Sequence, residues 1–385
     1  MLIKNENKMK MIIIGISLLI FAGLLWLARS GESATLFPTQ YGEDGAPLTV
    51  DFVPARVVSY ELIEPTDHTP FYGQLLSVEI LSGDLEGIIA GTEHFLASPM
   101  FPRYEVNDRL ILSLNEITDT IMVYNPNRTP VLIGFIILFL ALLCLIGGKR
   151  GVLSVLGLIF SILSIIWILV PLTLQGHSSI IIALVVATLI TLVSMTLLAG
   201  VNSKSLSAIA GCLFGVVSAA LLATIVGNLS FITGYHTPEA GTLSRLEEIR
   251  LSGIFVSGVI ISAMGAIMDT SVTIASSMEE IKRANPAMET TELFKAGFNV
   301  GRDAMGTMSN TLILAFVGSS LGLLLIIFSS DVSFLQFINY NSIGIEIIQG
   351  IAGSIGIVLT VPFTTFIASK LFSLNQAEKI GNSSE

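Results

Sequence analysis

The stretch Val152–Leu172, VLSVLGLIFSILSIIWILVPL, decides the class of this chain, because its 21 residues include no charge. A second uncharged run, Ser179–Gly200, follows after a gap of six residues. A helix of about 17 to 25 apolar residues is long enough to cross a bilayer. Over the whole chain, 52% of the 385 residues are hydrophobic and 12% are charged, whereas soluble proteins average about 25% charged residues. This composition excludes a soluble enzyme and a disordered chain, and it predicts a polytopic membrane protein.

Eight apolar runs predict an all-α polytopic bundle of about eight transmembrane helices. They cover residues 11–28, 130–147, 152–172, 179–200, 206–227, 251–275, 304–328 and 345–369. The first run follows three lysines and also suits a signal peptide, but the apolar part of a signal peptide usually has about 7 to 15 residues. We therefore expect an N-terminal anchor over 1–28, a seven-helix membrane domain over 129–370 and a cytoplasmic tail over 371–385.

Lysine and arginine predict the orientation, because they gather in the cytoplasmic loops of membrane proteins. With a cytoplasmic N-terminus, 12 of the 19 Lys and Arg residues fall in inside segments. Five of the other seven lie in one long outside segment, where the rule has little force. Both termini are therefore expected inside, with residues 29–128 outside.

Residues 29–128 are predicted to form a small all-β extracytoplasmic domain, either a barrel or a sandwich, and an OB-like barrel is one form that fits. Strand-like runs with β-branched and aromatic residues lie at 48–63, 74–81, 85–90, 109–114 and 120–124, separated by Gly, Pro and Asn turn signals. This segment holds 15 Asp and Glu but only five Arg, so it carries the whole net charge of -10. Nucleic-acid binding therefore has no support. The acidic residues could bind a cation or simply keep the surface soluble.

No metal or cofactor site is predicted. His68 and His94 are isolated, and no Cys/His cluster with metal-ligand spacing occurs. An enzyme is not expected either, because intramembrane hydrolysis requires paired aspartates, a Ser/His pair or a His-rich zinc motif within the membrane.

The run 251–275 differs from the earlier ones in having small and polar residues on one helical face. At steps of three and four residues these are Gly258, Ser262, Gly265, Asp269, Thr273 and Ser276. A carboxylate inside a bilayer costs about 2.5–3.5 kcal/mol on insertion scales, so Asp269 is a functional candidate.

Two further runs repeat this pattern. The run 304–328 and its entry carry Asp303, Thr307, Asn310, Thr311 and Gly318 on or beside one face. The run 345–369 adds Glu346, Gly350, Gly353, Thr360 and Thr364. Because the first two runs are antiparallel across a short loop, Asp269 and Asn310 are expected at similar depths.

The three faces together predict a hydrated pathway for a small solute or ion. Asp269, Thr273, Thr307 and Asn310 would line it, Glu346 would lie at its outer end, and Arg302 with Asp303 at its cytoplasmic mouth. The alternative is that Ser, Thr and Gly only tighten helix packing, while Asp269 caps or pairs near the interface.

Other local signals concern packing and boundaries. Gly211-x-x-x-Gly215 predicts close helix contact, and Pro171 is expected to end its helix. Ser244-x-x-Glu247 has capping-box spacing. Within the inside loop 276–303, Asn285-Pro286 predicts a helix start. That helix could lie on the membrane surface or dock a cytoplasmic partner.

The stretches Ser262–Glu280, SAMGAIMDTSVTIASSMEE, and Gly301–Leu321, GRDAMGTMSNTLILAFVGSSL, are similar to the YibE/F membrane-protein family. The resemblance covers about residues 35–370 and is closer to the longer, YibE-like members, which have an outer domain. It implies a bacterial cytoplasmic membrane location and a hetero-oligomer with a shorter family member. Family members often have proline after the Ser-Ser-Leu element, where this chain has Gly322. The resemblance implies no activity.

Two functions therefore stand open. The first is a transporter or permease component in which Asp269 binds a cation or couples transport, assisted by Thr273, Thr307 and Asn310. The second is a non-transporting scaffold or sensor whose acidic β domain binds an envelope or secreted partner. In both, membrane lipid surrounds the helices.

Overall fold

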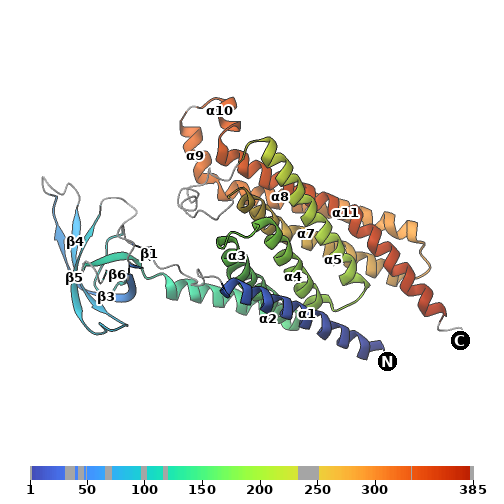
Figure 1. The fold of residues 1–385 in the computed structure, drawn as a ribbon, viewed down its shortest axis with the longest axis horizontal. Coiled ribbons are helices and arrows are strands. Elements are labelled where there is room, and N and C mark those ends of the chain that lie inside the picture. Colours follow the sequence, from blue (N-terminus) through green and yellow to red (C-terminus); the bar gives the residue numbers. More distant parts are fainter. Residues whose placement is uncertain are drawn as a thin grey trace. The chain divides into compact units, whose positions relative to one another are not determined.

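The computed structural model describes residues 2–30, 40–41, 47–48, 50–65, 72–96, 102–115, 120–232, 251–330 and 332–381. The chain divides into two compact units, one of residues 1–36 with 146–385 and the other of residues 37–145. Figure 1 shows that the first is built from long helices and that the second holds the strands. Each unit is described separately below. The predicted Ser244-x-x-Glu247 cap and His68 lie outside the described residues.

The helical unit contains several helices of membrane-spanning length. Its elements are α1 (Leu2–Ser30), the second part of α2 (Thr129–Ser164), the π-helix η1 (Ile165–Leu169), α3 (Val170–Leu174), α4 (Ser179–Ala199), α5 (Ser203–Leu229), α7 (Leu251–Ala284), α8 (Thr290–Ser319), α9 (Leu321–Ser329), α10 (Phe334–Ile338) and α11 (Asn341–Gly381). Among the described residues, six helices are long and apolar enough to cross a membrane, and the bent pair α8–α9 makes a seventh candidate.

Helix α2 is interrupted near the predicted boundary between two spans. Gly148 has φ 54° and ψ -132°, values that lie outside the helical region. A positive φ is far less strained for glycine than for other residues. The interruption separates the predicted runs 130–147 and 152–172, and Lys149 and Arg150 follow it directly.

The start of α5 is fixed by its sequence. The Asn202 side chain accepts a hydrogen bond from the Ser205 backbone N–H at 2.9 Å. In return, the Ser205 hydroxyl accepts one from the Asn202 N–H at 3.0 Å. This reciprocal capping box satisfies two backbone donors that a helix start otherwise leaves unpaired.

Helices α5 and α11 pack at very short range, which confirms the close contact predicted from Gly211-x-x-x-Gly215. A Cβ atom at Gly211 would overlap the hydroxyl of Thr364, and one at Gly215 would overlap that of Thr360. The Thr360 hydroxyl donates a hydrogen bond to the Gly211 carbonyl at 3.2 Å. Small residues therefore allow the two backbones to approach and to bond directly.

Three local expectations need correction. The helix carrying Pro171 runs on to Leu174, because the π-turn of η1 before it accommodates the proline. The helix after α7 begins at Thr290 with Glu289 as N-cap, not at Asn285-Pro286. The run 304–328 is two helices, α8 and α9, bent by 60° at Ser320 although no proline follows it.

The second unit contains a five-stranded antiparallel half-barrel sheet. Its strands are β3 (Val50–Ile63), β4 (Gly73–Ile80), β5 (Ile89–Phe95), β6 (Arg109–Asn115) and β7 (Thr120–Pro126), in the order β5-β4-β3-β6-β7. A two-stranded pair, β1 (Gln40–Tyr41) with β2 (Pro47–Leu48), precedes them. The predicted strand 85–90 is wrong in position, because a turn with Gly83 and Gly87 at positive φ occupies most of it.

Alternating side chains of the sheet form one apolar core. Ala55, Leu76, Val78, Leu110 and Leu112 are fully buried within it. The edge strands β5 and β7 are linked, because the Thr92 hydroxyl donates a hydrogen bond to the Ile121 carbonyl at 2.8 Å. The sheet therefore curls until its two edges meet at this bond.

The segment before β6 is fixed to the sheet by polar contacts. The Gln74 amide donates to the Tyr104 carbonyl at 2.8 Å and accepts from the Tyr104 N–H at 2.8 Å. The His94 ring, only 5% exposed, lies 3.0 Å from the Pro102 carbonyl oxygen through Nε2. His94 thus has a structural role. Burial lowers the pKa of His94, and it raises the pKa of Tyr104 to about 12.

Candidate functional site

The polar stripe of α7 lies on the outside of the helical unit. Ser262, Gly265, Asp269 and Thr273 are all exposed, whereas Ile267 on the opposite side is fully buried. The spacing of three and four residues explains this division, because it keeps the apolar residues on the side that packs against α5, α8 and α11. Asp269 lies about 15 Å along the helix from Glu279, the next acidic residue. The carboxylate is therefore exposed well inside an apolar span.

Helix α8 carries an equally exposed polar stripe. Gly306, Thr307, Asn310 and Thr311 are exposed, while Leu312 is buried. We call these four residues, together with the four exposed residues of α7, the α7–α8 polar face.

The two stripes overlap in level along the helices. A Cβ at Gly301 of α8 would lie 3.0 Å from Cδ1 of Ile274 on α7. A Cβ at Gly353 would meet both Leu312 of α8, at 2.8 Å, and Ala263 of α7, at 3.0 Å. In this register Asp269 is level with Gly306, and Asn310 is level with Gly265. Asn310 and Asp269 therefore differ in level by about 6 Å, roughly one helical turn.

The polar residues of α11 do not join this face. Thr360 and Thr364 are fully buried against α5. Glu346 is half-buried, and its Oε2 atom is buried without a hydrogen-bond partner among the described residues. Asp269, Thr273, Thr307 and Asn310 are thus exposed on two helices that pack together, whereas Glu346 lies on a third helix.

The residues predicted at the cytoplasmic mouth lie near the middle of α8. Arg302 and Asp303 are both exposed. The predicted surface helix of loop 276–303 is instead the first part of α8, packed on α7: a Cβ at Gly297 would overlap the Met278 side chain. The short connection is held by Lys282, whose ammonium donates to the Met288 carbonyl at 2.7 Å.

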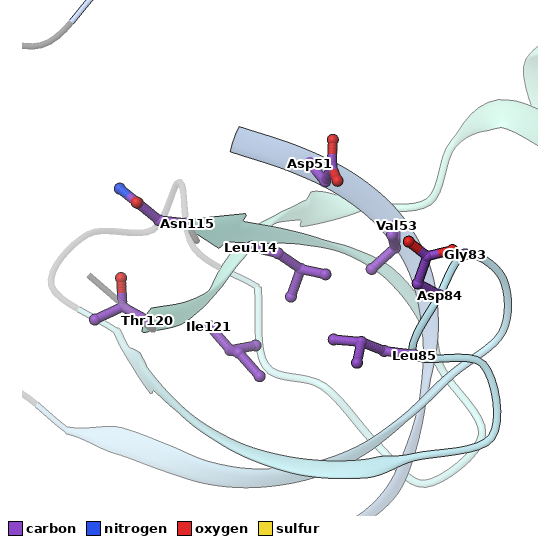
Figure 2. A pocket seen from close by; sticks show the side chains of 9 residues that line it. All are labelled: Asp51, Val53, Gly83, Asp84, Leu85, Leu114, Asn115, Thr120 and Ile121. Carbon is purple, nitrogen blue, oxygen red and sulfur yellow. The ribbon is translucent and has the colours of Figure 1, made fainter. Parts of the chain in front are cut away.

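A second candidate site is a pocket in the β domain, with a volume of about 360 Å³. Figure 2 shows Val53, Leu85, Leu114 and Ile121 pointing toward one another around the hollow. Polar residues lie around them: Asp51, Asp84, Asn115 and Thr120. No sequence signal singled out this pocket, because its walls come from three separate parts of the chain that only the curled sheet brings together.

Long apolar helices with a polar face, joined in one chain to a small β domain, define an integral membrane protein. The model of the YibE/F-like protein family matches residues 135–374. The chain therefore belongs to the YibE/F-like protein family, as its motifs around Asp269 and Thr307 predicted. Comparison with curated proteins gives no match, and neither does comparison with solved structures.

Proposed function

We propose that this chain is a component of a transporter or permease for a small solute or ion in a bacterial cytoplasmic membrane. The observation that carries the proposal is the α7–α8 polar face, where a carboxylate, an amide and hydroxyls are exposed within about two helical turns of one another along apolar helices. Lipid tails cannot hydrogen-bond to these groups, and intramembrane acidic residues commonly mark ion or proton pathways.

The chemistry of the face suits a small cation or a proton. The Asp269 carboxylate supplies the negative charge, and it can bind a cation or exchange a proton. The Thr273 and Thr307 hydroxyls and the Asn310 carboxamide oxygen can replace the water ligands of the ion. The face is open on one side, so a further subunit can cover it. The family resemblance separately implies a hetero-oligomer with a shorter family member.

The proposal includes the expected topology. The apolar segment Thr129–Leu174 has 46 residues, about twice the ~20 that cross a bilayer. With the break at Gly148 it counts as two spans, and the total becomes eight. Both termini are then cytoplasmic, the β domain is extracytoplasmic, Glu346 lies toward the outer surface, and Arg302 with Asp303 lies at the inner one. A cytoplasmic partner would meet the α7–α8 connection.

The test is ion flux through the purified chain in proteoliposomes that contain a pH-sensitive dye. Under an imposed potassium diffusion potential, we expect proton flux that Asp269→Asn abolishes, because the variant lacks the titrating group. Glu280→Gln is the matched control, since it removes an exposed α7 carboxylate outside the face and should leave the flux unchanged. Full flux in the Asp269→Asn variant would exclude the proposed role of this carboxylate.

A scaffold or sensor is the second candidate function, and the pocket of the β domain favours it. An apolar floor with acidic and amide groups at its rim suits a small, partly apolar ligand with a positive charge. The linked edge strands and the strand order also suit an OB-like barrel, a fold that binds ligands on its surface. If the chain is a scaffold or sensor, deletion of residues 35–125 should abolish its function, and the Asp269→Asn variant should keep it. The opposite pattern supports transport.

A further inference from the structure

The α7–α8 polar face is complementary to itself. Its helix α7 presents a hydrogen-bond acceptor, the Asp269 carboxylate, and its helix α8 presents a donor, the Asn310 amide. The contacts that flank these residues put Asn310 about one helical turn from the level of Asp269, toward the start of α7. Because each Cα–Cβ bond leans toward the N-terminus of its own helix, the two side chains lean toward each other in level. A surface whose donor and acceptor converge in this way can satisfy an identical surface that faces it.

We propose that a second copy of this chain docks on the α7–α8 polar face, related to the first by a two-fold axis along the membrane normal. Both copies then have the same orientation in the membrane, and every residue keeps its depth. Helix α7 of each copy faces α8 of the other, as an isologous interface requires. Each Asp269 carboxylate can accept a hydrogen bond from the Asn310 amide of the opposite copy.

The glycines of the face allow the helices to approach. No atom lies within 4 Å of the position that a Cβ would take at Gly265 or at Gly306. Both residues are exposed, so the space above them is open to a partner. In membranes, small residues at an interface permit close backbone contact, and polar side chains bond across it.

A second copy explains the face better than lipid does. Acyl chains offer no hydrogen-bond donor to Asp269 and no acceptor to Asn310, whereas the second copy supplies both. The inference rests on the proposed function only because both concern this face, and it assigns the subunit that covers the face to a second copy of the chain.

The experiment is disulfide cross-linking between two differently tagged copies in native membranes. Both copies lack the native Cys144 and Cys212; one carries Gly265→Cys and the other Thr311→Cys. Oxidation should give a product of twice the chain mass that bears both tags. A matched pair on exposed positions of α5, Val217→Cys with Leu221→Cys, should give none.

Three outcomes of the cross-linking experiment would overturn the inference. One is no mixed-tag product although each cysteine reacts with a maleimide. Another is an equal yield from the α5 control pair. The last is a cross-linked product whose second chain is a different protein, such as a shorter family member.

Dimer formation can also be measured without cysteines, by single-molecule photobleaching in liposomes at several protein-to-lipid ratios. Asn310→Leu should weaken the dimer about tenfold, which corresponds to about 1.4 kcal/mol, because the Asp269 carboxylate loses its donor. Leu221→Ala on α5 should leave the affinity unchanged. An unchanged dimer in the Asn310→Leu variant would contradict the pairing.

These results separate the dimer from transport. A dimer whose proton flux does not depend on Asp269 supports the interface and removes the proposed function. A monomer with Asp269-dependent flux overturns the interface and leaves the proposed function standing.

Discussion

The α5–α11 contact and the α7–α8 polar face are built from the same residue types at the same spacing, but their surroundings are opposite. Between α5 and α11, the glycines leave no space for a Cβ, and Thr360 and Thr364 are fully buried. On the α7–α8 polar face, Gly265 and Gly306 have open space above them. A stripe of glycine and threonine therefore indicates that a helix approaches something closely, but it does not say whether the neighbour is in the same chain.

The largest expected difference between the two regions comes from adding bulk at a glycine. In the Gly215→Leu variant, the Cβ atom alone would lie 2.8 Å from a methyl carbon of Ile267 and 2.9 Å from the carbonyl oxygen of Gly356. The rest of the leucine side chain has no space. Over-packing of this kind costs typically 1–3 kcal/mol or more. We expect a marked fall in the thermal midpoint in detergent, measured by size-exclusion chromatography after heating. Gly265→Leu should leave the midpoint of the monomer unchanged. Equal losses in the two variants would mean that the face is already packed within the chain.

A smaller effect distinguishes the two buried threonines. Thr360 donates a hydrogen bond to the Gly211 carbonyl, whereas the Thr364 hydroxyl is buried without a partner among the described residues. Thr360→Val should therefore reduce the unfolding free energy by about 0.6–1.7 kcal/mol, the range for hydrogen bonds between membrane helices. Thr364→Val should be neutral or slightly stabilising, because it removes an unsatisfied polar group of similar volume. Reversible unfolding in mixed micelles measures both, and the reverse order would contradict the assigned bonding.

The smallest expected effect is a pH dependence of the stability of the β domain. It must be known before any pH effect is assigned to the α7–α8 polar face. Burial lowers the pKa of His94 below its ordinary value of 6.5, and the bond to the Pro102 carbonyl offsets part of that change. Below about pH 6.5 the unfolded chain takes up a proton that the folded β domain resists, so this group lowers stability as the pH falls, until the folded pKa is also passed.

Amide-exchange protection of residues 104–112, corrected for intrinsic rates, should decrease modestly between pH 7.5 and pH 5.5. His94→Gln should reduce this pH dependence, and the exposed His177→Gln should not. A pH effect on flux or association that persists in His94→Gln then belongs to the membrane helices.

Much of the architecture could be predicted from local patterns. Uncharged runs located the long apolar helices, and the steps of three and four residues located the stripe that contains Asp269. Pleat alternation and turn residues located four of the five strands of the main sheet. The errors fell where local rules compete: a π-turn accommodated Pro171, and the bend at Ser320 needed no proline. The β-domain pocket could not be predicted, because the residues around it are distant in the sequence.

The sequence by itself determined the class of the protein, its family and the residues that share each helical face, because these follow from composition, helical periodicity and motif. Only the tertiary structure decided which face is buried. Thr360 and Asp269 each lie on a small-residue stripe of a membrane helix, yet one packs against α5 and the other is exposed. Periodicity fixes the direction of a side chain relative to its own helix, whereas its surroundings depend on the helix that packs beside it.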